Sequence, residues 1–192
     1  MARQERPVDD SYYEQERIPL LSQGDIFRDV PLAYPSPAEQ LLLDESEEVG
    51  VRAFLSGPLD FGPAMLITPT CSMRAQQAEG YSHPVRTLVP LLPLETFLEA
   101  RVVKPDSIGL ARKYDALINY MYLPPCEIEE LDFSLPESFA LLYMPVTLHH
   151  DFIDGNRMTQ LAVDGARQLQ RKLVWFDSGW LESRELFDPP MD

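Results

Sequence analysis

Cys71 is the residue whose type and position come nearest to those of a catalytic group. It lies in Thr70-Cys71-Ser72. This stretch follows the apolar run Ala64–Ile67 and the Thr68-Pro69 pair that ends the run. A cysteine nucleophile needs a neighbouring imidazole or cation that stabilises its thiolate. His83 and His149 are the candidate bases, with His150 beside the latter. Cys71, His83 and His149 are therefore the candidate catalytic set of a hydrolase or transferase.

A structural role is the competing interpretation of Cys71, and the one we favour. A buried cysteine packs like a small hydrophobic residue. Cys71 lies only a few residues beyond the apolar run, and the nearest basic residue in the sequence is Arg74. Apolar surroundings raise the pKa of a thiol and slow its reactions. We therefore expect Cys71 to be buried and to react slowly.

Polar side chains near Cys71 are the candidate binding groups. Thr70 and Ser72 carry hydroxyls on either side of the thiol, and Arg74 and Arg86 are the arginines that follow. These four residues are the predicted binding positions of the chain.

The ligand types for zinc are present, but their spacing does not predict a metal site. Cys71, Cys126, His83 and the pair His149-His150 match no zinc motif. Neighbouring side chains of a strand also point to opposite faces, which separates His149 from His150. We predict no metal ion and no cofactor.

Several segments must position these residues. The run Ala64–Ile67 is short and bounded by Gly62-Pro63 and Pro69, which predicts a strand buried on both faces. Further apolar runs predict strands over 87–94, whose prolines indicate an edge or a bulge, and over 119–123 and 139–146. Apolar residues from Met158 to Phe176 recur with a period of 3.6, which predicts a long amphipathic helix.

These elements predict an α+β domain. Short strands come first, helices follow, and one long amphipathic helix closes the chain, which is typical of a small, strongly bent sheet or SH3-like barrel. We divide the chain into an extended N-terminal arm (1–17), a single α+β domain (18–176) and an acidic C-terminal tail (177–192). The arm contains few apolar residues and is expected to be dispensable for folding.

Composition restricts the classes of partner. The chain of 192 residues has a formal net charge of −15, which disfavours non-specific binding of nucleic acid. It has no apolar stretch long enough to span a membrane, and its N-terminus lacks the apolar run of a signal peptide. Two widely separated cysteines fit a reducing cytoplasm.

Part of the chain resembles the MazF/PemK family of small barrel-like toxins that cut RNA. The resemblance covers residues 22–94 and is carried by Gly24-Asp25-Ile26, Gly62–Ile67 and Leu88–Leu91. Gly62 stands where the family has its catalytic Arg, and Leu92 stands where it has Thr. The resemblance therefore implies a barrel without the ribonuclease chemistry.

A second resemblance is to uncharacterised bacterial proteins with a strand that ends in a Cys-Asp pair. It is carried by the stretch Thr68–Ser72, and by Tyr122–Pro124 and Leu169–Leu173 farther along the chain. Ser72 stands here in place of the Asp, and the likeness implies no known function.

The leading hypothesis is a non-enzymatic cytoplasmic binding or assembly module with a protein partner. The sequence carries no GxGxxG, GxxxxGK[ST], HExxH or GxSxG motif. A homo-oligomer is left open. The alternatives are an enzyme that depends on Cys71 and an RNA-cleaving relative of the MazF/PemK toxins.

Overall fold

The structure is a computed structural model of the chain. The residues that it describes are 12–14, 20–33, 42–44, 52–54, 59–73, 75–76, 80–81, 84–100, 104–113, 117, 119–153 and 155–178. Of the predicted site residues, Arg74 and His83 lie outside this set, as does most of the predicted acidic tail.

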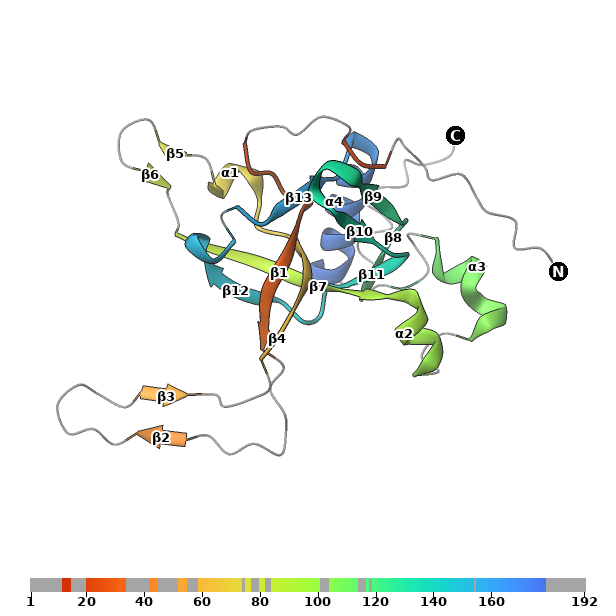
Figure 1. The fold of residues 1–192 in the computed structure, drawn as a ribbon, viewed down its shortest axis with the longest axis horizontal. Helices are drawn as coiled ribbons and strands as arrows, with labels where there is room; N and C mark the ends of the chain where they lie inside the picture. Colours follow the sequence, from red (N-terminus) through yellow and green to blue (C-terminus); the bar gives the residue numbers. More distant parts are fainter. Residues whose placement is uncertain are drawn as a thin grey trace.

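A strongly curled antiparallel sheet of seven strands forms the centre of the fold (Figure 1). Its main path runs β13-β1-β4-β7-β11-β8, and β12 pairs with β7 beside β11. The strands are β1 (Asp25–Ala33), β4 (Leu59–Leu66), β7 (Val85–Pro93), β8 (Tyr120–Leu123), β11 (Ser138–Leu141), β12 (Val146–His149) and β13 (Arg157–Gln160).

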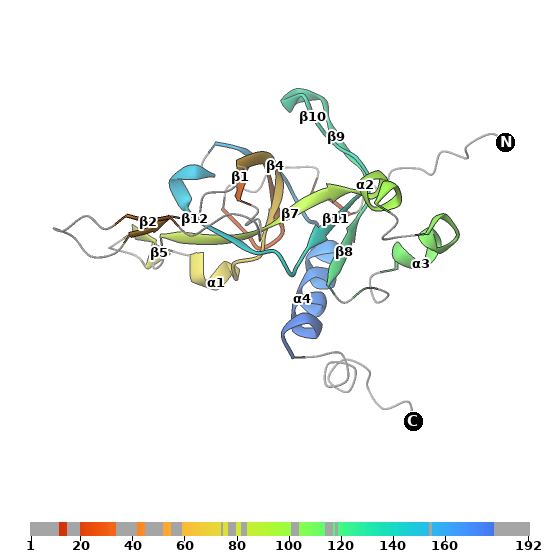
Figure 2. The same ribbon diagram turned by 90° about the horizontal axis from the view of Figure 1, so that it is seen from below.

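Smaller elements surround this sheet. Figure 2 shows one of them, the hairpin of β9 and β10, reaching beyond the sheet. The short strands form three hairpins: β2 (Leu42–Asp44) with β3 (Arg52–Phe54), β5 (Ala75–Gln76) with β6 (Gly80–Tyr81), and β9 (Cys126–Ile128) with β10 (Phe133–Leu135). The helices are α1 (Thr70–Met73), α2 (Leu94–Glu99), α3 (Ile108–Ala111), α4 (Val163–Ser178) and three 3-10 turns, η1 (Pro105–Ser107), η2 (Glu129–Leu131) and η3 (His150–Phe152).

Irregularities in β1 explain why the sheet curls. The register of β1 with β13 shifts between Ile26 and Phe27, and its register with β4 shifts between Phe27 and Val30. Between those two residues, Asp29 has a φ of 53°, in the left-handed region. Bulges of this kind bend a strand and increase its twist. The resulting α+β fold, a curled sheet with a C-terminal helix, confirms the predicted fold class.

The last three residues of β4, 64–66, are buried on both faces, as their apolar sequence predicts. Met65 belongs to the cluster that includes Leu169 of α4, whereas Ala64 and Leu66 belong to a second cluster on the other side. All three residues are fully buried. Successive side chains of a strand point to opposite faces of the sheet. This one strand therefore contributes side chains to both core clusters.

The strand β7 is central, so of the edge or bulge that its prolines indicated, the edge is excluded. It pairs with β4 on one side and with β11 and β12 on the other. On this second side, β12 ends its pairing at Leu88 and β11 begins at Leu91. Pro90 lies in the interval between the two partners, where the ladder is interrupted. Two short strands can therefore flank a strand that contains proline.

The predicted strand over 139–146 is divided in two. β11 and β12 are separated by a turn at Leu142–Pro145, in which the N–H of Met144 donates to the carbonyl of Leu141 at 3.0 Å. Both strands pair with β7. Apolar composition alone did not reveal this turn, because Leu142 is buried in the first core cluster.

The C-terminal helix begins later than its periodicity predicted. Met158 lies in β13 and is buried there, while α4 starts at Val163. A buried strand residue happens to continue the 3.6-residue spacing of the helix. Within α4, Leu169 is fully buried, and Ala166, Leu173 and Phe176 pack against the same cluster. The amphipathic character of the helix is thus confirmed.

Tyr12 and Tyr13 are core residues although they lie in the predicted arm. Tyr13 forms a β-bridge with Leu161, and its hydroxyl donates to the carbonyl of Pro124 at 2.6 Å. Both tyrosines belong to the first core cluster, and burial raises the pKa of Tyr13 above its usual value. The remaining limits of the predicted domains stay predictions. No helix in the described part of the chain is long and apolar enough to cross a membrane.

Candidate functional site

Two segments that bear reactive side chains leave the sheet at the same end. β4 and β12 both run antiparallel to β7, so they run parallel to each other. Leu88 of β7 lies opposite Leu66 of β4 on one side and Val146 of β12 on the other. Beyond that level, β4 leads to Cys71, and β12 leads to His149. The topology therefore places the predicted nucleophile and a predicted base at one end of the sheet, on either side of β7.

Hydrogen bonds hold the turn that contains Cys71. The backbone N–H of Gln23 donates to Thr70 Oγ1 at 3.0 Å, and Gln23 Nε2 donates to the carbonyl of Ile67 at 2.7 Å. The N–H of Thr87 donates to Thr68 Oγ1 at 2.7 Å. The loop before β1 and the start of β7 thus both fix the exit of β4.

Cys71 is exposed, so the prediction that it is buried is wrong. The turn after Pro69 is helical, and Met73 is the residue of that turn that enters the core. Residues two positions apart point to nearly opposite sides of a helix, which directs Cys71 outward. The buried cysteine of the chain is Cys126, and burial raises its pKa.

The structure describes the side chains of two of the four predicted binding residues, Thr70 and Arg86. Thr70 is half-buried, and its Oγ1 accepts a hydrogen bond from the backbone N–H of Gln23. Arg86 is fully buried in β7, and its role in binding stays a prediction. Its Nη1 donates to the carbonyl of Val85 at 2.9 Å. The side chain of Ser72 lies outside the described part, as do Arg74 and His83.

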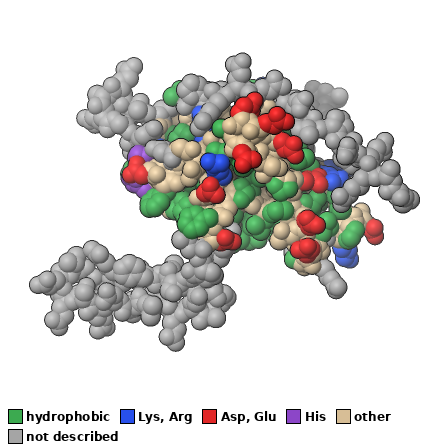
Figure 3. Space-filling model, in the orientation of Figure 1, with side chains coloured by type: hydrophobic (Ala, Val, Ile, Leu, Met, Phe, Trp, Pro, Cys, Tyr) green, Lys and Arg blue, Asp and Glu red, His purple; other side chains and the backbone are tan. Residues whose placement is uncertain are grey.

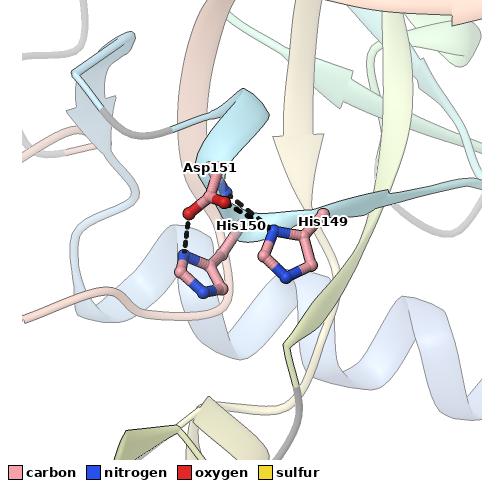
Figure 4. A group of neighbouring side chains, drawn as sticks. All are labelled: His149, His150 and Asp151. Carbon is pink, nitrogen blue, oxygen red and sulfur yellow. Dashed lines mark hydrogen bonds and ion pairs between the residues drawn. The ribbon is translucent and has the colours of Figure 1, made fainter.

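His149 belongs to a compact group with His150 and Asp151 (Figure 4). The Nδ1 atom of His149 lies 3.0 Å from Asp151 Oδ2, and the Nδ1 atom of His150 lies 3.1 Å from Asp151 Oδ1. The two imidazole rings are stacked, with centroids 4.5 Å apart and planes inclined by 30°. One carboxylate therefore bridges both rings.

The two histidines do not point to opposite faces, contrary to the argument from strand alternation. β12 ends at His149, and the 3-10 turn η3 begins at His150. The change of backbone geometry breaks the alternation at the residue where it would have separated the rings. The sequence signal that would have indicated this group is His149-His150-Asp151 itself, three adjacent ligand-type residues at a strand end.

Buried neighbours anchor the backbone of this group. The N–H of His150 donates to the carbonyl of Pro84 at 2.9 Å, next to the start of β7. The N–H of Ile153 donates to the carbonyl of His150 at 3.0 Å, and Ile153 is fully buried in the second core cluster. The exposed imidazole of His149 and the half-buried imidazole of His150 therefore lie next to a turn that the core holds in place.

Two exposed apolar side chains accompany the histidines. Val85 lies opposite His149 in the β7–β12 pair and is 47% exposed. Phe152 follows Asp151 in η3 and is 61% exposed. Figure 3 shows the purple histidine side chains at one end of the molecule with hydrophobic side chains near them. We call Val85, His149, His150, Asp151 and Phe152 the histidine end.

The other polar clusters have structural explanations. Asp25 and Arg157 form a buried ion pair at 3.0 Å, and Arg157 also donates to the carbonyl of Leu20 at 2.9 Å. Arg112 donates two hydrogen bonds to Glu137, the second at 2.7 Å, and these bonds raise the pKa of the guanidinium. The first pair holds the loop before β1, and the second joins α3 to the start of β11.

Comparisons with known proteins identify no family. No family model matches the sequence, and no curated protein matches it either. The resemblance to the MazF/PemK toxins thus stays a prediction.

Proposed function

We propose that this chain is a non-enzymatic binding module and that it contacts a protein partner through the histidine end. One observation carries the proposal: Val85, opposite His149 in the strand pair, and Phe152, next to Asp151 in η3, are both exposed in the segments that hold the two stacked imidazoles. Exposed apolar and aromatic side chains next to polar groups are typical of the anchor positions of protein interfaces. The core-held turn makes these side chains a fixed surface.

Charge indicates the chemistry of the partner. The chain has a net charge of −15, and complementary potentials accelerate association and exclude partners of like charge. We therefore propose a partner with an apolar patch and a basic rim. A reducing cytoplasm, where the two free cysteines persist as thiols, is the proposed compartment.

Site-specific photocrosslinking in cells tests this function. A photoreactive phenylalanine analogue replaces Phe152 in one version of the protein and Leu110 in the matched control, because Leu110 is exposed to a similar extent, 59%, on α3. We expect a discrete adduct from position 152 and none from position 110. The substitution Val85→Asp should weaken the adduct, while Val163→Asp, at another exposed position, should leave it unchanged.

The alternative outcomes are distinct. Equal adducts from positions 152 and 110, or an adduct from position 110 alone, would refute the proposed surface. An adduct at twice the chain's mass of 21.9 kDa would identify a second copy of this chain and would replace the proposed basic partner by a homo-oligomer.

A cysteine-dependent hydrolase or transferase is the second candidate, favoured by the exposure of Cys71 at the same end of the sheet as His149. In the described part of the chain, no hydrogen bond reaches the Cys71 thiol. A base would therefore have to reach Cys71 when substrate binds, as catalytic hydrogen bonds often tighten only in the complex.

A further inference from the structure

We propose that His149, His150 and Asp151 bind a divalent transition-metal ion such as Zn²⁺. The residues offer two imidazole nitrogens and one carboxylate, the ligand types that zinc takes in sites with three protein ligands. Imidazole ligands select Zn²⁺, Ni²⁺ or Cu²⁺ over Mg²⁺ and Ca²⁺, which prefer oxygen. This inference goes beyond the proposed function and does not depend on it.

The distances lie close to those of a metal site. Tetrahedral zinc with bonds of about 2.0–2.2 Å separates its ligand atoms by roughly 3.3–3.6 Å. The two distances between histidine Nδ1 and aspartate oxygen are 3.0 and 3.1 Å, and the three ligand atoms all lie within 4.8 Å of one another. Small rotations about side-chain bonds therefore suffice to close the site.

The contacts within the group already surround one imidazole nitrogen with polar atoms. The backbone N–H of Asp151 lies 3.5 Å from His149 Nδ1. A carboxylate oxygen lies 3.0 Å from the same nitrogen. A proton on the imidazole nitrogen, donated to the carboxylate, accounts for this contact without a metal ion. A metal ion would take the place of that proton and would contact all three ligand atoms at once.

The surroundings favour a cation in two respects. The net charge of −15 attracts cations over long range. Arg86, a buried basic residue of β7, lies opposite Leu148, whereas His149 lies opposite exposed Val85. Directly opposed residues share a face of a sheet and successive ones alternate, so Arg86 is directed to the face away from His149.

Three protein ligands leave one coordination position open. In zinc proteins, such a position holds water or an external ligand. Because the side chains of His149 and Asp151 are both exposed, water or a donor atom from outside the chain would complete the coordination. The ion would thus be accessible and exchangeable, unlike that of a closed structural site.

Metal titration of the tag-free protein tests the proposal. After treatment with EDTA and its removal, Zn²⁺ is titrated in competition with a chromophoric chelator. We expect one equivalent per chain, and at least about tenfold weaker binding in His149→Ala, His150→Ala and Asp151→Asn. The matched control Glu129→Gln/Glu130→Gln, in exposed η2, should bind as the wild type does.

Further variants separate this site from the other ligand types in the chain. Cys71→Ser and His83→Gln should keep the one equivalent of Zn²⁺. Substitution with Co²⁺ should give the intense visible absorption of a tetrahedral site in the wild type, and this absorption should disappear in His149→Ala/His150→Ala. Circular dichroism and thermal melting of the metal-free variants establish that they fold.

Specific results would overturn the proposal. Unchanged Zn²⁺ binding in the folded His149→Ala/His150→Ala protein, loss of binding in Cys71→Ser or His83→Gln, or the absence of saturable binding would each do so. Photocrosslinking in the presence of EDTA keeps the two proposals apart, because an adduct from position 152 that persists without metal supports the protein interface alone.

Discussion

The two cysteines show how strongly reactivity depends on the position of a single residue. Cys71 follows a core strand but lies on the outer side of a short helical turn, and it is exposed. Cys126 begins β9 and is buried in the first core cluster, where desolvation is the main cause of its raised pKa. Since the thiolate is the reactive form, burial and a raised pKa both slow the reactions of Cys126.

Thiol labelling at neutral pH should therefore distinguish the two residues. We expect iodoacetamide to label Cys71 in the native protein and to leave Cys126 unmodified, whereas both react in denaturant. Peptide mass spectrometry measures each site, and Cys71→Ser should abolish native labelling. Equal rates at both sites would contradict the structure, and a rate at Cys71 well above that of free cysteine would favour the cysteine-dependent enzyme.

Helix α4 packs one face against the sheet and also contacts the N-terminal segment. Leu169 is fully buried, Gln168 is half-buried and Gln170 is exposed. The hydroxyl of Tyr12 donates to Gln168 Oε1 at 3.2 Å. Lys172 is buried with its Nζ 5.8 Å from the centre of the Trp175 ring. Polar residues of this helix thus also contribute to its packing.

Alanine substitutions along α4 should have unequal costs. Leu169→Ala leaves a cavity in the first core cluster and should lower the free energy of unfolding by about 2–5 kcal/mol. Gln168→Ala removes one hydrogen bond and should cost about 0.5–1.5 kcal/mol. Gln170→Ala should cost about 0.5 kcal/mol or less, because its side chain is exposed.

Urea denaturation measures these differences in the free energy of unfolding. Equal losses in all three variants would show that α4 does not dock on the sheet through the face that contains Leu169. A cost for Gln168→Ala as small as that for Gln170→Ala would show that the bond from Tyr12 contributes nothing to stability.

The N-terminal segment 12–14 joins several elements of the molecule. Tyr12 and Tyr13 pack in the cluster that joins the sheet to α4, and the N–H of Glu14 donates to the carbonyl of Gln160 at 2.9 Å. The N–H of Ala162 in turn donates to the carbonyl of Tyr12 at 3.0 Å, just before α4 begins. This short segment therefore contacts β13 and the start of α4 together.

Two truncations separate this contribution from that of the residues before it. Removal of residues 1–17 should lower the melting temperature by at least about 6 °C, because the loss of two buried aromatic side chains costs several kcal/mol. Removal of residues 1–11 retains Tyr12 and Tyr13 and should change the melting temperature by much less. Differential scanning calorimetry provides the measurement, and equal melting temperatures for the two truncated proteins would restore the view of a dispensable arm.

The features that could be predicted from the amino-acid sequence are local. The run Ala64–Ile67 predicted a strand buried on both faces, because a short apolar segment bounded by prolines and glycine is stable only inside a core. The spacing of Leu169, Leu173 and Phe176 predicted the amphipathic helix, because residues with this spacing lie on one face of a helix and pack in the core. Together these patterns sufficed for the α+β class and the bent sheet.

The tertiary structure alone decided which residues meet. Two tyrosines in a polar segment became core residues because β13 and α4 provide partners for them. β7 became a central strand because β4, β11 and β12 pair with it, although its prolines indicated an edge or a bulge. His149 and His150 came together because the strand ends between them. In these cases tertiary structure outweighed the local pattern. The local sequence does not indicate which distant segment a residue will contact.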